Sequence, residues 1–240
     1  MPNTEQEETL ISHLEALRAT LLKCFASLAI MLVPMFLFAP YFMNLLIKVM
    51  LQNTPLTLNF FAPMEVFILQ LKTAFVLDIL ICFPYIAKQV WDFVSPALYK
   101  NERYFIKSLV FSSSFLFIIG VLFCLFFILP LVIRFGMSFV TDNLRPLFGI
   151  SNLITLALWL SIVFGLMFQF PLITYALIKS NIVTYQTMRH KRPYIFLGIL
   201  VLSALLTPPD IVSQLMLSLP TYGLFEIGLF FGKNKKIFDL

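Results

Sequence analysis

The stretch Ser108–Ile133, SLVFSSSFLFIIGVLFCLFFILPLVI, carries no charged residue. A helix that crosses a bilayer needs about 20 consecutive apolar residues, so this stretch alone is long enough to span a membrane. The whole chain has the same character, because 60% of its 240 residues are hydrophobic and only 12% are charged. Soluble domains carry roughly 25% charged residues. The sequence therefore predicts an all-α integral membrane protein with no room for a sizeable soluble domain.

Six apolar stretches divide residues 1–240, which we expect to form a single membrane domain. The expected spans lie at about residues 23–45, 66–88, 107–133, 152–178, 193–207 and 211–231. The fifth, counted from Tyr194 to Thr207, would be roughly 21 Å long, shorter than a hydrocarbon core of about 30 Å. Only the turn Thr207–Asp210 separates it from the sixth. These features predict a short helical hairpin at the end of the chain.

Proline residues occur inside or at the ends of several spans. Proline lacks a backbone N–H group and bends a helix, so the spans should be kinked and should form a concave wall. The prolines concerned are Pro34, Pro63, Pro84, Pro130, Pro171 and Pro220.

Residues 1–22 precede the first span and contain an amphipathic pattern. Leu10, Leu14, Leu17 and Leu21 share one helical face. This spacing predicts a helix that lies along the cytoplasmic surface of the membrane before the first span begins.

The distribution of basic residues predicts the orientation of the six spans. Of the 17 lysines and arginines, one side of the membrane holds only four: Lys48, Lys72, Arg134 and Arg145. The other side holds all the rest, so the positive-inside rule places both termini in the cytoplasm. Because these charges form short clusters between apolar stretches, they do not predict nucleic-acid binding.

The sequence contains no recognisable catalytic, metal-binding or phosphate-binding motif, which argues against an enzyme and against a bound cofactor. The two histidines, His13 and His190, lie in basic or amphipathic segments where a solvated side chain is expected. The cysteines Cys24, Cys82 and Cys124 lie in apolar stretches without the spacing of a metal site or a disulfide framework.

Polar side chains at membrane depth need a partner, a water-filled cavity or a place at the interface. Asp78 and Gln169 lie inside spans, Glu226 lies in the last span, and Glu65 and Lys72 lie nearer the outer end. If Asp78 and Gln169 met, they could line the mid-membrane site of a secondary transporter for a small solute. The small size, the short hairpin and the lack of two similar halves weigh against that alternative.

Four segments together resemble the TatC family, the multi-spanning subunit of the twin-arginine protein translocase. They occur in the same order as in the family and cover almost the whole chain. The segments at 93–103 and 206–214 are specific in combination, whereas the segment at 13–18 alone would be a weak match. The segments are HLEALR at 13–18, FVSPALYKNER at 93–103, KRPY at 191–194 and LTPPDIVSQ at 206–214.

The resemblance implies a receptor for twin-arginine signal peptides of folded proteins in the bacterial inner membrane, driven by the proton-motive force. It also implies that Glu15 and Glu102 bind the two arginines. A carboxylate accepts two parallel N–H bonds from a guanidinium group, which lysine does not reproduce. Without the resemblance, the first segment could be a simple membrane anchor and the second an ordinary interfacial loop. The same two segments supply further expected signal-peptide residues, namely Arg18, Pro96, Tyr99 and Arg103.

The resemblance also implies partner proteins, a residue that faces them and residues of the external face. The partners are single-span TatA and TatB subunits, further copies of this chain within a hetero-complex, and the lipid bilayer. Gln169 occupies a position in the fourth span that faces the partner groove, where many relatives have glutamate. The external face should include the residues Pro63, Glu65, Pro208, Pro209 and Asp210, although Asp210 could equally cap the sixth helix.

Overall fold

The computed structural model describes residues 3–51, 58–98, 103–138, 148–180, 182–206 and 211–233. These ranges are almost entirely helical, in agreement with the predicted fold class. The helices are α1 (Asn3–Leu51), α2 (Pro63–Leu98), α3 (Arg103–Phe123), α4 (Leu129–Met137), α5 (Ile150–Met167), α6 (Phe170–Lys179), α7 (Tyr185–His190), α8 (Arg192–Leu206) and α9 (Ile211–Lys233). A π-helical segment, η1 (Cys124–Ile128), joins α3 to α4. Two short strands, β1 (Leu58–Asn59) and β2 (Phe148–Gly149), pair in parallel.

Within the described ranges, five helical segments are long and apolar enough to cross a membrane. They are Leu14–Met50, Met64–Val94, Lys107–Met137, Ile150–Lys179 and Gln214–Lys233. The remaining expected span, the fifth at residues 193–207, corresponds to α8, which has only 15 residues. At 1.5 Å per residue this helix is about 22 Å long, shorter than a typical hydrocarbon core of about 30 Å. The predicted short helix before the final span is therefore present.

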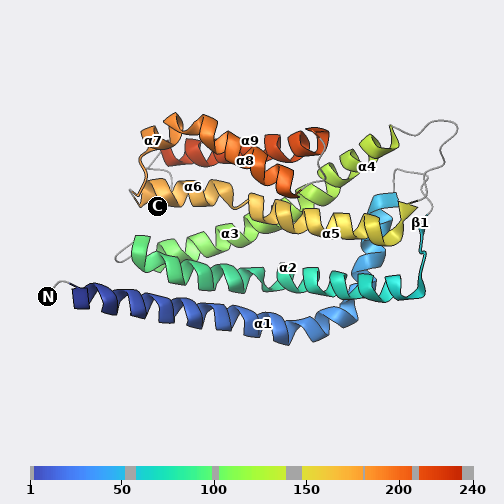
Figure 1. The fold of residues 1–240 in the computed structure, drawn as a ribbon, viewed down its shortest axis with the longest axis horizontal. Coiled ribbons are helices and arrows are strands. Elements are labelled where there is room, and N and C mark those ends of the chain that lie inside the picture. The colour runs from blue at the N-terminus through green and yellow to red at the C-terminus, as the bar shows by residue number, and fades with distance from the viewer. Residues whose placement is uncertain are drawn as a thin grey trace.

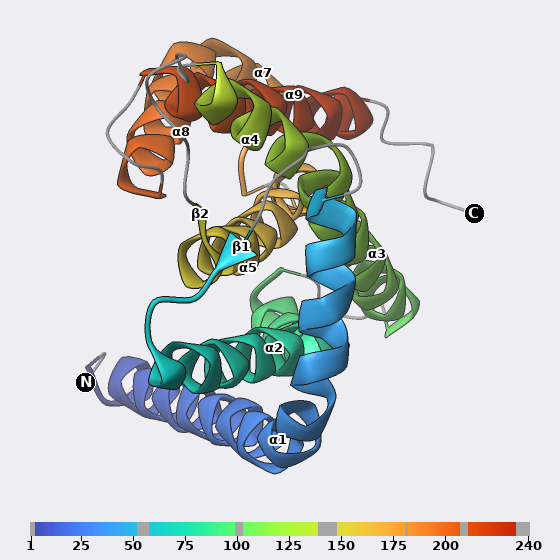
Figure 2. The ribbon, with the colours of Figure 1, turned by 90° about the vertical axis from the view of Figure 1, so that its right-hand side faces the viewer.

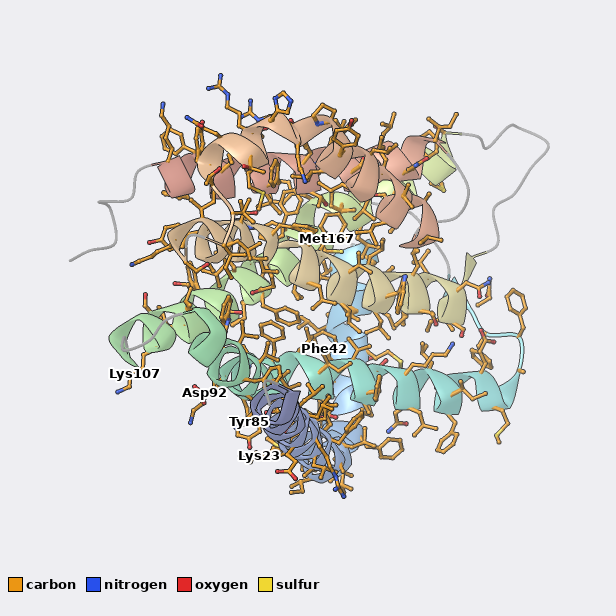
Figure 3. The ribbon with its side chains drawn as sticks, turned by 60° about the vertical axis from the view of Figure 1, so that its left-hand side comes forward. Lys23, Phe42, Tyr85, Asp92, Lys107 and Met167 are labelled. Carbon is orange, nitrogen blue, oxygen red and sulfur yellow. The ribbon has the colours of Figure 1, made fainter. Side chains whose placement is uncertain are left out.

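The helices run along the long axis of the molecule and lie side by side (Figure 1). Figure 2 shows α1 and α2 on one side, α8 and α9 on the opposite side, and α3 and α5 between them. Met167, the last residue of α5, lies in the middle of the molecule, whereas Asp92 and Lys107 lie near one end (Figure 3). The start of α1, the end of α2 and the end of α9 all lie toward that end (Figure 1).

The expected surface helix and the expected first span form one helix in the structure. Helix α1 continues without a break for 49 residues, and it contains Pro34 and Pro40. The last turns of α1 bend away from the axis of the rest of the helix and cross α2 (Figures 1 and 2). Proline is a common cause of such a bend, because its ring displaces the preceding turn. Leu14 and Leu21 of the amphipathic pattern are exposed, so this chain does not cover them.

Two further prolines accompany interruptions of the spans, as the sequence predicts. The segment η1 lies just before Pro130, which cannot donate to the carbonyl group one turn earlier. The fourth span is divided into α5 and α6 by a turn at Phe168 and Gln169, and Pro171 lies in the first turn of α6. This turn places the side chain of Gln169 toward α3.

Glycine allows the helices to approach closely at the centre of the molecule. A Cβ atom on Gly120 of α3 would lie 2.6 Å from the carbonyl oxygen of Phe164 in α5. A Cβ atom on Gly165 would lie 2.5 Å from the ring of Phe117, which stacks on Phe83 of α2 at 3.6 Å between ring centroids. Small residues at helix crossings are typical of membrane proteins. The α2–α3–α5 contact is therefore tightly packed.

Candidate functional site

An apolar cavity lies where α2, α3 and the α5–α6 turn meet. Its volume is about 400 Å³, and its wall includes Phe83 and Trp91 of α2, Ser113 of α3, and Gln169 and Ile173 from the α5–α6 region. Gln169 is 8% exposed. The position that was expected to face a groove in the fourth span therefore lines this cavity, which we call the Gln169 cavity.

The side chain of Gln169 is held by hydrogen bonds to two helices. Its Oε1 accepts from the Ser113 hydroxyl at 2.5 Å, and its Nε2 donates to the Ser113 carbonyl oxygen at 3.1 Å. The same Nε2 lies 3.4 Å from the carbonyl oxygen of Gly165. The amide acts as both acceptor and donor, which an ionised carboxylate cannot do. Ser113 escaped the sequence analysis, although the run Ser112–Ser114 inside an apolar stretch is an unusual signal.

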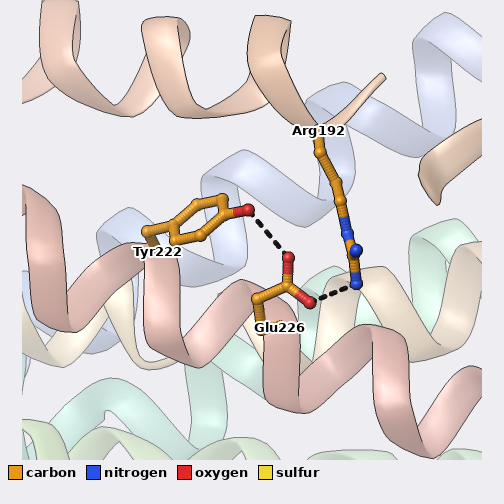
Figure 4. Close-up of polar contacts among 3 residues, drawn as sticks. All are labelled: Arg192, Tyr222 and Glu226. Carbon is orange, nitrogen blue, oxygen red and sulfur yellow. Dashed lines mark hydrogen bonds and ion pairs between the residues drawn. The ribbon is translucent and has the colours of Figure 1, made fainter. Parts of the chain in front are cut away.

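A second polar cluster joins α8 to α9 (Figure 4). Arg192 donates to Oε2 of Glu226 at 2.5 Å, and the Tyr222 hydroxyl donates to Oε1 at 2.8 Å. The sequence predicted that Glu226 needs a partner, a water-filled cavity or a place at the interface, and the structure supplies partners in Arg192 and Tyr222. The pairing with Arg192 was not predictable because 34 residues separate the two. Tyr222 lies one helical turn before Glu226, which is a local signal that could have been used.

Asp78 is buried at the contact between α1 and α2, with 1% of its surface exposed. Its Oδ1 lies 3.4 Å from Sγ of Cys82. The same sulfur atom lies 3.8 Å from the carbonyl oxygen of Ser27 in α1. The other oxygen, Oδ2, has no hydrogen-bond partner among the described residues. Asp78 and Gln169 therefore take part in separate groups of contacts, and the structure does not join them in one site.

At the opposite end from Asp92 and Lys107, Glu65 organises the start of α2. Its Oε2 accepts from the backbone N–H groups of Phe61 at 2.8 Å and Ala62 at 3.3 Å. The paired strands β1 and β2 lie in the same region, with Leu58 opposite Phe148. Lys72 lies 3.4 Å from the Thr155 hydroxyl, which ties α2 to α5 on this side. The contacts of Glu65 are those of a helix-capping residue.

The structure describes only part of the expected signal-peptide site. Glu15 and Arg18 are exposed on α1. Tyr99 and Glu102 lie outside the described residues, as do the side chains of Pro96 and Arg103. On the expected external face, Pro63 begins α2, whereas Pro208, Pro209 and Asp210 lie outside the described residues.

Comparison with known proteins decides the family. Residues 12–220 match the family Sec-independent protein translocase protein (TatC). The chain belongs to the TatC family. The TatC of Escherichia coli (strain K12) is 33% identical over 233 residues, which cover 96% of this chain and 90% of the relative. The TatC of Carboxydothermus hydrogenoformans is 34% identical over 226 residues, which cover 94% and 93%.

The fold of the TatC family agrees with this structure. A crystal structure of the twin-arginine translocase receptor TatC superimposes with a TM-score of 0.84 at 30% identity, covering 93% of this chain and 99% of that chain. The chain is thus a multi-spanning membrane protein of a protein translocase family, not an enzyme. Membership of this family excludes the transporter alternative, and the separation of Asp78 from Gln169 removes the mid-membrane site on which that alternative depended.

Proposed function

We propose that this chain is the signal-peptide receptor of a twin-arginine translocation system in the bacterial inner membrane. It binds twin-arginine signal peptides of folded proteins and nucleates the translocation complex, which the proton-motive force drives. The observation that carries this proposal is the family match over residues 12–220, which includes both segments expected to bind the signal.

The two arginines would bind at Glu15 and Glu102. Glu15 is exposed on α1, and the start of α1 lies toward the same end of the molecule as the end of α2 (Figure 1). Each carboxylate offers two oxygen atoms to a planar guanidinium group, which favours arginine over lysine. The neighbouring residues Arg18, Pro96, Tyr99 and Arg103 would shape this site.

The chain crosses the membrane six times in this proposal, with both termini in the cytoplasm. Five long helical segments and the short α8 supply the spans. An even number of crossings is supported by the start of α1 and the end of α9, which lie toward the same end (Figure 1). The short α8 would require local thinning of the bilayer or a partly sunken hairpin.

The Gln169 cavity would receive side chains from an apolar helix of a single-span TatA or TatB subunit or of the signal peptide. Its wall is almost entirely apolar, with the amide of Gln169 and the hydroxyl of Ser113 as its polar groups. The kinked spans would form the concave wall around it, and several copies of this chain would assemble with those partners. The opposite end, with Pro63, Glu65, Pro208, Pro209 and Asp210, would be the external face.

The proposal is tested by binding of a twin-arginine peptide to membranes that contain the assembled complex. Glu102→Gln should weaken binding while the chain remains inserted, because an amide gives a weaker partner for guanidinium than a carboxylate does. Glu65→Gln is the matched control, since Glu65 caps α2 at the opposite end. Unchanged affinity in Glu102→Gln, or equal losses in the two variants, would contradict the assignment.

A further inference from the structure

A hollow between α2 and α3 carries an excess of positive charge. Lys88 and Asp92 of α2 and Lys107 and Ser114 of α3 line it, and its volume is about 620 Å³. Among the described residues, neither lysine forms an ion pair or a hydrogen bond. With one carboxylate and two ammonium groups, the hollow has a formal net charge of one positive unit. It is therefore complementary to a group with one negative charge.

The hollow lies where a membrane surface is expected. Lys107 is the first residue of one candidate span, and Lys88 lies about two turns before the end of another. Figure 3 shows Asp92 and Lys107 at the same end of the molecule. Lysine near the end of a span extends its ammonium group toward the lipid headgroups while its methylene chain stays in apolar surroundings. At this depth we expect the phosphate layer of the bilayer.

The apolar part of the hollow continues along the surface of α3 toward the middle of the membrane. Pro84, Val110 and Phe111 complete the lining. Phe111 is 74% exposed, Phe115 56% and Ile118 52%. These three residues follow the i, i+4, i+7 spacing of one helical face. An occupant with a charged head and a long apolar chain would therefore contact both parts.

We propose that this hollow binds an anionic phospholipid that carries a single phosphodiester, such as phosphatidylglycerol. The phosphate lies between Lys88 and Lys107, and an acyl chain lies along Phe111 and Phe115. Basic pockets between membrane helices are a common form of lipid headgroup site. The net positive charge favours an anion over a twin-arginine segment, and free phosphate would leave the apolar face uncovered. The inference does not depend on peptide binding.

Native mass spectrometry of the purified full chain in mild detergent tests the lipid site. Phosphatidylglycerol and phosphatidylcholine with identical acyl chains are each titrated, and the bound fraction is measured. We expect tighter binding of phosphatidylglycerol to the wild type. Each lysine near an anionic lipid contributes roughly fivefold to its binding constant. In Lys88→Gln/Lys107→Gln the preference for phosphatidylglycerol should therefore fall by about 25-fold. Lys88→Arg/Lys107→Arg should retain it.

Two controls separate a site from general attraction between charges. Lys191→Gln/Lys233→Gln removes two exposed lysines outside the hollow and should leave the preference within about twofold of wild type. Soluble glycerophosphoglycerol should not displace the lipid, because it lacks the acyl chain. Equal binding of the two lipids by the wild type would overturn the proposal. So would equal losses in the two glutamine variants, or displacement by the soluble headgroup.

Discussion

The side chain of Gln169 connects the break between α5 and α6 to Ser113 of α3 through two hydrogen bonds, one to the hydroxyl and one to the carbonyl oxygen. The turn at Phe168 and Gln169 opens the helix and directs the amide across the interface. In a membrane, a buried polar group without a partner is costly, so this pairing satisfies the amide and fixes the position of α3. The polar group of the Gln169 cavity is therefore part of its framework.

The pairing of Gln169 with Ser113 should be measurable as a coupling energy. We expect Gln169→Leu and Ser113→Ala each to lower the free energy of unfolding in detergent, with a coupling of roughly 0.5–1.5 kcal/mol in the double-mutant cycle. Ser114→Ala is the control, because among the described residues the Ser114 hydroxyl bonds only within its own helix, to Val110. Additive losses from Gln169→Leu and Ser113→Ala would contradict the pairing.

The close contact of α3 with α5 should not tolerate even a methyl group. We expect Gly120→Ala to destabilise the protein by about 1–3 kcal/mol, since the new Cβ atom would meet the backbone at Phe164 and the helices would have to separate. Gly223→Ala should cause no loss, because no atom of the described part of the chain lies within 4 Å of a Cβ atom there. Thermal unfolding of the two variants in the same detergent compares them directly. A Gly120→Ala midpoint equal to that of wild type would refute the contact.

The ion pair of the terminal hairpin should be more costly to break than to replace. Glu226→Leu leaves Arg192 without its carboxylate, so we expect a loss of about 1–2 kcal/mol. This is less than for a fully buried pair, because 36% of the Arg192 side chain and 32% of the Glu226 side chain are exposed. The double variant Arg192→Met/Glu226→Leu should recover part of the loss. A double variant no more stable than Glu226→Leu would show that the pair does not act as a unit.

The sequence predicted those features that depend on local pattern. Apolar stretches located the spans, and the final helix begins at Ile211, where the sequence placed its start. The turn Thr207–Asp210 indicated that the helix before it is short. Proline positions predicted the interruptions at η1 and between α5 and α6, because the missing N–H group acts within a single helix. Glu226 was recognised as a residue that needs a partner, a water-filled cavity or a place at the interface, because charge inside a span is costly wherever it lies.

The features that escaped prediction depend on contacts between segments far apart in the chain. Arg192 reaches Glu226, and Gln169 reaches Ser113, only because the fold brings their helices together. The four-residue spacing of Asp78 and Cys82 can be read from the sequence. The contact of Cys82 with Ser27 of α1 cannot, because 55 residues separate the two. The pairing of β1 with β2 gave no signal, since two residues per strand are too short for a pattern.

The most direct test of the receptor assignment is site-specific photo-crosslinking in membranes that contain the complete translocase. A photo-reactive probe is placed beside Glu102, and signal peptides that differ only in carrying Arg-Arg or Lys-Lys are added. The account predicts strong crosslinking to the Arg-Arg peptide and little to the Lys-Lys peptide, because only guanidinium groups pair with carboxylates through two parallel bonds. Equal crosslinking to both peptides, or none to either with the assembled complex intact, would contradict it.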